Sequence, residues 1–135
     1  MITAADYFGS WFNHVDATQE RKDAADALLD KVNDLLLEAE ANEVEIHTNP
    51  HTGTCVSGQT YGGFRPQDCP QGAPNSAHKQ ARAVDVYDPH GDLDRWLTDA
   101  RLEAHGLYRE APSSTEGWTH LTDRAPASMH RTFQP

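Results

Sequence analysis

The chain has few basic residues, only two cysteines and no long apolar run. Its 11 Lys and Arg face 21 Asp and Glu, which gives a formal net charge of −10. Binding of nucleic acid through its phosphates needs a basic patch that releases counterions, so we expect no nucleic-acid partner and no anionic membrane partner. No apolar segment approaches the length of a membrane span. What remains is the composition of a small acidic globular domain.

The length of 135 residues predicts a single domain over residues 1–135 with one core. Residues 1–43 form a helical front part, and residues 44–135 form a mixed part that carries the candidate chemistry. The first residues, Met1 to Asp6, have neither the basic residues nor the apolar segment of a secretory signal. We therefore expect synthesis in a cytoplasm, with another route to any place of action outside it.

The front part predicts two helices, over residues 3–14 and 17–41. In the second, apolar residues recur at steps of three and four and form one stripe. Asp16 or Thr18 is expected to cap its start. The members of the stripe are Ala25, Leu28, Leu29, Val32, Leu35, Leu36 and Ala39.

The rear part predicts strands over residues 44–48 and 83–87, a helix over 92–105 that ends at Gly106, a strand beginning at Leu107 and another over 117–122. Residues 49–75 form a long irregular region rich in Gly and Pro. Because the aromatic residues and the arginine of residues 61–65 lie within it, we expect this region to dock onto the domain.

The two cysteines, Cys55 and Cys69, leave alternatives open. They can form a disulfide in an oxidising compartment or stay as thiols in a reducing one. A second hypothesis groups them with His47 and His51 as a separate structural zinc site, although their spacing matches no common zinc pattern.

The strongest chemical pattern consists of His78, Asp85 and His120. Two imidazole nitrogens and one carboxylate oxygen make a three-ligand catalytic zinc site whose fourth position stays open for water. Asp85 lies in the middle of an expected strand, where aspartate is depleted, so its presence calls for a partner. The pattern therefore predicts a shared metal and, from the open position, a zinc hydrolase.

The segment from Ser76 to Asp85 resembles the Ser-x-His-x-x-Gly-x-Ala-x-Asp motif of the M15 family of zinc peptidases. Trp118-Thr119-His120 resembles the second motif of that family, and Gly63-Phe64-Arg65 resembles its upstream Gly-Tyr/Phe-Arg element. The family includes D-alanyl-D-alanine carboxypeptidases and dipeptidases and the L-alanyl-D-glutamate endopeptidases of phages. It shares its metal-site architecture with the N-terminal domain of hedgehog proteins.

The resemblance implies an α+β fold with a small antiparallel sheet, flanking helices and zinc at the sheet. His78, Asp85 and His120 are then the zinc ligands. Arg65 stabilises the oxyanion or holds a substrate carboxylate, unless it forms a salt bridge that fixes the loop.

Ser76, at the start of the first motif segment, and Tyr61, two residues before the Gly63-Phe64-Arg65 element, are expected to contact substrate. Ala81 replaces the glycine of the motif. Alanine is still small, so the turn survives this replacement if its φ is negative.

The sequence pattern identifies the general base less clearly than it identifies the three candidate ligands. Members of the family with a glutamate base place it three residues before the second histidine, where this chain has Gly117, and Glu116 lies one residue further away. On a straight strand four residues span about 13 Å, so a bend at Gly117 is needed to bring Glu116 back. We expect Glu116 to be the base through such a bend. Glu110 and His130 are the other candidates, and Asp123 has the wrong strand parity.

The resemblance implies hydrolysis of a stem-peptide amide of bacterial peptidoglycan. The absent signal peptide fits a phage lytic or virion protein, with other virion proteins as further partners. Two alternatives stay open. One is a zinc-containing structural or wall-binding module without turnover, and the other is a metal-dependent amidase that acts on a different small substrate.

Overall fold

The computed structural model describes residues 1–58 and 60–135. Gln59, which falls within the predicted irregular region, lies outside the described residues. The chain combines helices with a four-stranded sheet, which confirms the α+β class. Within the described part, no helix combines the length and the apolar character needed to cross a bilayer.

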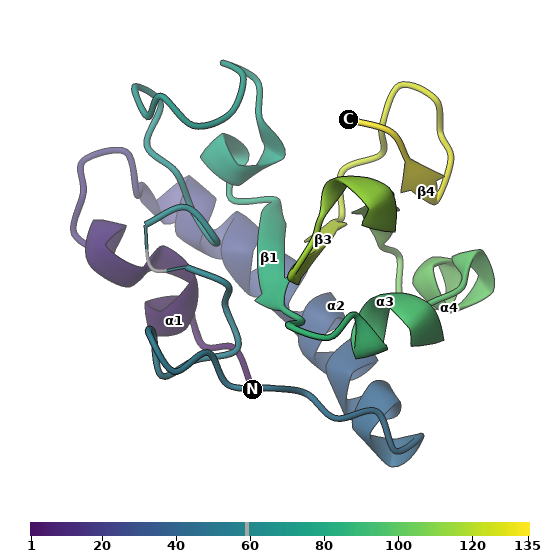
Figure 1. Cartoon of the computed structure of the whole chain (residues 1–135). Coiled ribbons are helices and arrows are strands. Elements are labelled where there is room, and N and C mark those ends of the chain that lie inside the picture. The colour runs from purple at the N-terminus through teal and green to yellow at the C-terminus, as the bar shows by residue number, and fades with distance from the viewer. Residues whose placement is uncertain (59) are drawn as a thin grey trace.

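The sheet has the strand order β1-β3-β2-β4 (Figure 1). The first three of these strands are β1 (Ala83–Tyr87), β3 (Trp118–Thr122) and β2 (Tyr108–Glu110), and they pair antiparallel, as predicted. The edge strand β4 (Thr132–Phe133) pairs parallel with β2, so the expectation of a purely antiparallel sheet is wrong at this edge.

The long helix α2 (Gln19–Ala41) lies behind the sheet in Figure 1. All seven members of the predicted apolar stripe are buried, and Thr18 caps the helix by accepting a hydrogen bond from the backbone N–H of Arg21. Val84, Val86 and Leu121 join the stripe in one hydrophobic core. Because side chains alternate along a strand, the remaining face of β1 and β3 is left for polar residues.

The first helix is shorter than predicted. Its α-helical part, α1 (Ala4–Phe8), begins with a capping box of Thr3 and Asp6 and ends where Gly9 adopts a φ of +53°. A 3₁₀ turn over Gly9–Trp11 follows. The aromatic residues still anchor the segment, since Tyr7 and Phe8 are fully buried.

The predicted strand over residues 44–48 does not form. The free edge of β1, where a further strand would pair, is occupied by the irregular region instead. Ser57 N donates to Asp85 O, Tyr87 N donates to Cys55 O and Asp85 N donates to Gly62 O. These hydrogen bonds occupy the backbone groups at the free edge of β1, so residues 44–48 have no strand edge with which to pair.

The irregular region is docked, as expected. Phe64 is buried beside the ring of Phe8, with ring centres 5.1 Å apart, and its N–H donates to Tyr7 O. The indole N–H of Trp11 donates to Thr60 O. The region ends at a 3₁₀ turn, η2 (Ala77–Gln80), which leads into β1.

The predicted helix over residues 92–105 is two helices, α3 (Asp92–Trp96) and α4 (Asp99–Ala104). The break falls at Leu97, whose ψ of 136° is extended, and Thr98 caps α4 by accepting from Arg101 N. Gly106 has the positive φ expected after a helix. A last 3₁₀ turn, η3 (Pro112–Ser114), connects β2 to β3.

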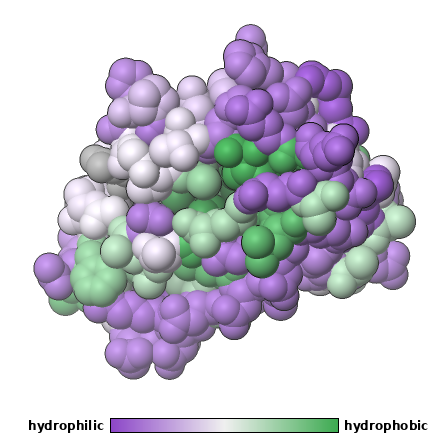
Figure 2. All heavy atoms as spheres, turned by 90° about the horizontal axis from the view of Figure 1, so that it is seen from below, coloured by the Kyte–Doolittle hydropathy of each residue, from purple (hydrophilic) through white to green (hydrophobic). Residues whose placement is uncertain are grey.

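The surface is largely hydrophilic in the view of Figure 2. Figure 2 shows the molecule from below the view of Figure 1, where hydrophilic residues surround a smaller apolar area in the middle of the face.

Candidate metal centre

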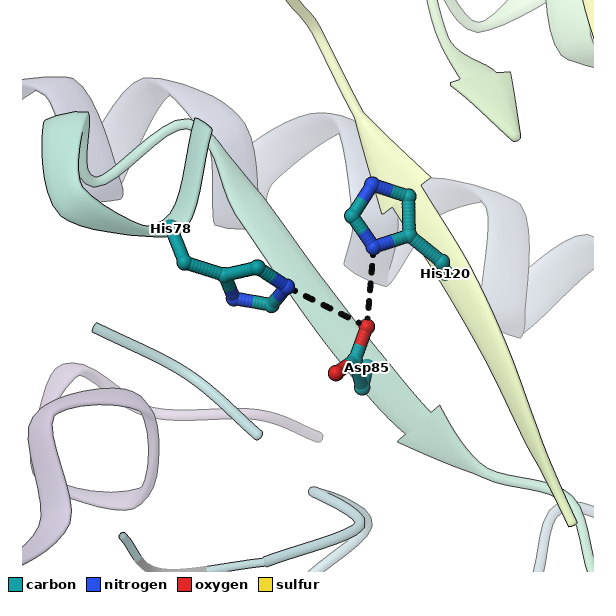
Figure 3. A group of neighbouring side chains, drawn as sticks. All are labelled: His78, Asp85 and His120. Carbon is teal, nitrogen blue, oxygen red and sulfur yellow. Dashed lines mark hydrogen bonds and ion pairs between the residues drawn. The ribbon is translucent and has the colours of Figure 1, made fainter. Parts of the chain in front are cut away.

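Three elements bring His78, Asp85 and His120 together, and Figure 3 shows their side chains pointing toward one another. His78 comes from η2, Asp85 from the middle of β1 and His120 from the middle of β3. Asp85 and His120 are directly paired in the antiparallel register, so their side chains share the face opposite the core. The predicted convergence of these three residues is therefore present.

The donor atoms lie close to the arrangement that a small divalent cation requires. Asp85 Oδ1 lies 2.9 Å from His120 Nδ1 and 3.3 Å from His78 Nε2. Tetrahedral bonds of about 2.0 Å place two ligand atoms about 3.3 Å apart. The donor set, two neutral nitrogens and a carboxylate oxygen, also suits a borderline-soft metal such as zinc. These residues therefore fit a divalent cation.

The orientation of His78 is fixed by a second hydrogen bond. Its Nδ1 lies 2.8 Å from the carbonyl oxygen of Gly63, so the protonated Nδ1 donates there and Nε2 is left to face Asp85. Metal-binding histidines are commonly held in this way, because the outer bond sets both the tautomer and the ring direction.

Gly63 has no room for a side chain, which explains the residue type. A Cβ at this position would lie 1.9 Å from Tyr7 O. The same backbone approach lets the neighbouring Phe64 donate to Tyr7 O. The Gly63-Phe64-Arg65 element is thus held against α1 and presents its carbonyl to His78.

Asp85 is an ionised carboxylate in a buried position. Burial by itself raises the pKa of an acid, but His78 and His120 oppose it, and the pKa of Asp85 is held well below its usual range. Arg65 adds a cationic partner, with Nη2 3.5 Å from Asp85 Oδ2. The negative charge that a metal needs is therefore present.

Arg65 forms a salt bridge at the site, which is one of the two roles left open for it by the sequence. Besides its ion pair with Asp85, its Nε donates to the carbonyl of Tyr61 at 2.8 Å. It also lines a pocket of about 530 Å³ that opens beside Asp85 and is bounded by Tyr61, Tyr87 and Trp118. The guanidinium thus fixes the loop and borders the pocket at once.

A second pocket, of about 340 Å³, opens on the other side of the centre and is lined by His120. Ser76 lies on its wall, and the Ser76 hydroxyl also accepts a hydrogen bond from His78 N at the start of η2. The three candidate ligands are between 3% and 9% exposed, but a pocket reaches the centre from each side. The two residues expected to contact substrate border different pockets, Tyr61 the one beside Asp85 and Ser76 the one at His120.

Glu110 joins the same face of the sheet. Tyr108 and Arg109 of β2 pair with Thr122 and Leu121 of β3, and the next position of this register places Glu110 beside His120. Glu110 Oε2 lies 3.8 Å from His120 Nδ1. One row across the sheet thus carries Asp85, His120 and Glu110.

Glu116, the base candidate nearest to His120 in the sequence, lies elsewhere. It is exposed in the turn before β3 and lines a separate pocket with His90 and Arg95. Gly117 does bend the chain, with a φ of +92°. Among the described residues, no hydrogen bond or ion pair joins Glu116 to the three candidate ligands.

The two remaining base candidates are also separate from the centre. Asp123 is buried in ion pairs with Arg82 and Lys31, which fix the end of β3 to β1 and α2. His130 is exposed in the irregular segment just before β4. The structure therefore brings Glu110, of the four candidates, closest to His120.

Ala81, at the glycine position of the motif, has a φ of +58° and a ψ of 37°. The φ is therefore positive, and the condition of a negative φ is not met. Left-handed backbone costs an L-residue about 1–2 kcal/mol relative to glycine, so the turn has kept the conformation that suits glycine even though alanine occupies it. Its methyl group is completely buried.

Both cysteines are free thiols, Cys55 partly exposed and Cys69 buried, so the disulfide alternative is not formed. The hypothetical site of His47, His51, Cys55 and Cys69 is not among the metal-compatible clusters of the described residues. His47 instead faces Asp92 and packs against the ring of His90.

Comparison with known proteins gives no further assignment. No family model, no curated protein and no solved structure matches the chain. The functional argument therefore depends on the motif segments and on the geometry of the centre.

Proposed function

We propose that the chain is a zinc-dependent peptidase that hydrolyses an amide bond in the stem peptide of bacterial peptidoglycan. The observation that carries this proposal is the convergence of His78, Asp85 and His120 between two pockets. The hedgehog-like and M15-like assignment, the peptide substrate and a role in a phage lytic or virion protein come from the resemblance of the motif segments and belong to the same proposal.

His78, Asp85 and His120 hold the metal. A zinc ion in this place supplies a Lewis acid that lowers the pKa of bound water and polarises a carbonyl. The chain supplies the rest of the chemistry through residues on both sides of the ligands.

Glu110 is the general base in this proposal. Its carboxylate lies 3.8 Å from the ligand nitrogen of His120, which places it within reach of a water molecule beside that ligand. It takes a proton from the attacking water and returns it to the leaving amine. Glu110 replaces Glu116 in this role because Glu116 faces a different pocket.

Arg65 stabilises the negative charge that develops on the carbonyl oxygen. Its guanidinium borders the pocket beside Asp85 and is already oriented by Tyr61 O, so little rearrangement is needed when the charge appears.

The test uses purified protein, zinc and isolated sacculi. We expect zinc-dependent release of new amino groups, and we expect His78→Ala to lose both zinc binding and release. His51→Ala is the matched control, since His51 is an exposed histidine outside the cluster. Tight binding to sacculi without release would instead support a structural or wall-binding module. Turnover of small amides with no action on sacculi would support an amidase.

A further inference from the structure

The pocket of about 530 Å³ beside Asp85 is lined by three aromatic side chains that have no ring or cation packed against them. The chain has three Trp, four Tyr and four Phe residues. Among the described residues, every one of these rings except those of Tyr61, Tyr87 and Trp118 lies against another ring or a cationic side chain. The three exceptions all border this pocket, which we call the aromatic pocket.

The sheet places the aromatic pocket directly beside the candidate ligands. Tyr87 of β1 is paired with Trp118 of β3, just as Asp85 is paired with His120 (Figure 3). Residues two apart on a strand share a face and lie about 7 Å apart, so the two rows follow each other on one face of the sheet. A group bound between the aromatic rings is therefore adjacent to the candidate centre.

The polar groups of the aromatic pocket are mostly uncharged and available to a ligand. Its two charged residues, Arg65 and Asp85, form an ion pair with each other. The indole N–H of Trp11 and the hydroxyl of Tyr7, elsewhere in the fold, have backbone acceptors. In contrast, several donors of the pocket make no hydrogen bond with the described residues: the hydroxyls of Ser57, Thr60, Tyr61 and Tyr87 and the indole N–H of Trp118.

Uncovered aromatic rings combined with free hydroxyl groups suit a sugar ring. The C–H groups on one face of a pyranose pack against the electron-rich face of an aromatic ring. The hydroxyl and amide groups at its edge exchange hydrogen bonds with hydroxyl side chains. A charged ligand finds no counter-charge here outside the pair of Arg65 and Asp85, and a purely apolar group uses none of the free donors. The volume lies within the usual range of small-molecule sites.

We propose that the aromatic pocket binds a sugar ring of the glycan strand to which the stem peptide is attached. The chain then prefers peptides that still carry their sugar, with Tyr61, Tyr87 and Trp118 as the specificity residues. This inference rests on the proposed function for the identity of the sugar as part of the substrate. The binding of the sugar itself does not require the metal.

The first experiment measures binding to the metal-free full chain by NMR. The probes are N-acetylmuramyl-L-alanyl-D-isoglutamine and the same dipeptide with an acetyl group in place of the sugar, which carries the same charge. We expect the sugar compound to shift the indole N–H resonance of Trp118 and to leave those of Trp11 and Trp96, which do not line the pocket. The sugar-free dipeptide should bind about 10-fold more weakly, because it loses the contact with the rings.

Variants of Tyr61 separate stacking on an aromatic ring from general apolar contact. Tyr61→Leu keeps an apolar side chain but removes the ring, and it should weaken binding of the sugar compound about 3- to 10-fold. Tyr61→Phe keeps the ring and should retain most of the affinity. Phe12→Leu is the matched control, since Phe12 is 38% exposed, against 41% for Tyr61, and lies outside the pocket.

Three results of the binding experiment would overturn the inference. They are equal affinity for the two probes, sugar-induced shifts that spare Trp118, and an affinity for the sugar compound that Tyr61→Leu does not change. Tighter binding of N-acetylphenylalaninamide than of the sugar compound at Trp118 would also overturn it, because the pocket would then select an apolar side chain.

A second experiment compares two substrates of the zinc-loaded chain, stem peptides freed from the glycan and the same peptides still attached to a disaccharide. We expect kcat/KM to be about 10-fold higher for the attached form, and we expect Tyr61→Leu but not Phe12→Leu to reduce this preference. Cleavage of both forms at equal rates would refute the inference and leave the proposed function intact. Absence of any cleavage, combined with selective binding of the sugar compound by NMR, would refute the proposed function and leave the sugar pocket intact.

Discussion

Asp85 occupies the middle of a strand, where aspartate is uncommon, and its Oδ1 faces both histidines. In the absence of a metal, the hydrogen bond and ion pairs to this carboxylate stabilise its ionised form. A cation therefore meets a site in which the three donors already lie within 4.8 Å of one another. Little further ordering is needed on binding.

Glu110 and Glu116 provide the sharpest test at this scale. We expect Glu110→Gln to lower kcat by about 10²- to 10⁴-fold, because the attacking water loses its proton acceptor, while zinc affinity changes little. Glu116→Gln, its control, should lower kcat less than about threefold. Steady-state kinetics with metal analysis of both variants give the answer. The opposite ranking would restore Glu116 as base, and loss of zinc from Glu110→Gln would make Glu110 a ligand.

The convergence of His78, Asp85 and His120 could be predicted from the sequence, whereas Glu110 could not be singled out. His78 and Asp85 lie within one short motif, and the strand around Asp85 is evident from its β-branched neighbours. The closeness of Glu110 to His120 depends on the pairing register of β2 with β3, which the intervening η3 turn sets. Sequence distance alone favoured Glu116 for this reason.

At the scale of elements, local signals predicted most helices and central strands, and long-range pairing decided the failures. The stripe of α2 and the alternation of β1 are properties of short windows, and both elements formed as predicted. Residues 44–48 have the alternation of a strand but no free edge to join. The two residues of β4 are too few to give any periodic signal.

Asp88 connects two of these elements and allows a test of how they are held. Its carboxylate is 2% exposed and accepts from the backbone N–H groups of Leu93 and Asp94 at the start of α3. It also accepts from the hydroxyl of Thr119 in β3. We expect Asp88→Ala to lower the free energy of unfolding by about 2–4 kcal/mol, because three buried donors lose their acceptor.

The measurement is urea denaturation at neutral pH. Asp92→Ala is the control, since Asp92 forms a partly exposed pair with Arg95 on the same helix, and it should cost less than about 1 kcal/mol. Equal costs for the two variants would show that the contact between α3 and β3 does not depend on Asp88.

For the molecule as a whole, the expected consequence of metal binding is a gain in thermal stability. Ligands that bind only the folded chain add about 2.7 kcal/mol at a concentration 100-fold above Kd, which for a chain of this size raises Tm by on the order of 10 °C. Differential scanning calorimetry with zinc, and then with excess chelator, measures the change. Magnesium is the control, because imidazole ligands disfavour it.

His78→Ala should abolish the zinc-dependent rise in Tm and leave the chain folded. A rise of the same size in this variant would show that zinc binds elsewhere. The other metal-compatible cluster of the described residues, His14, Asp16 and Asp68, would then be examined first.

Strands carry two of the three candidate ligands and loops form most of the pocket walls, and this separation has a consequence for engineering. Asp85 and His120 lie on paired strands, whereas the two pockets are lined largely by residues 57–58, 60–62, 65, 73 and 75–77 and by residues after β3. Randomising those loop positions, with Gly63 kept as the support of His78 and Arg65 kept for its proposed catalytic role, should retune selectivity without dismantling cation capture. A library built on this scaffold can therefore be screened for new amide targets while its cofactor loading stays constant.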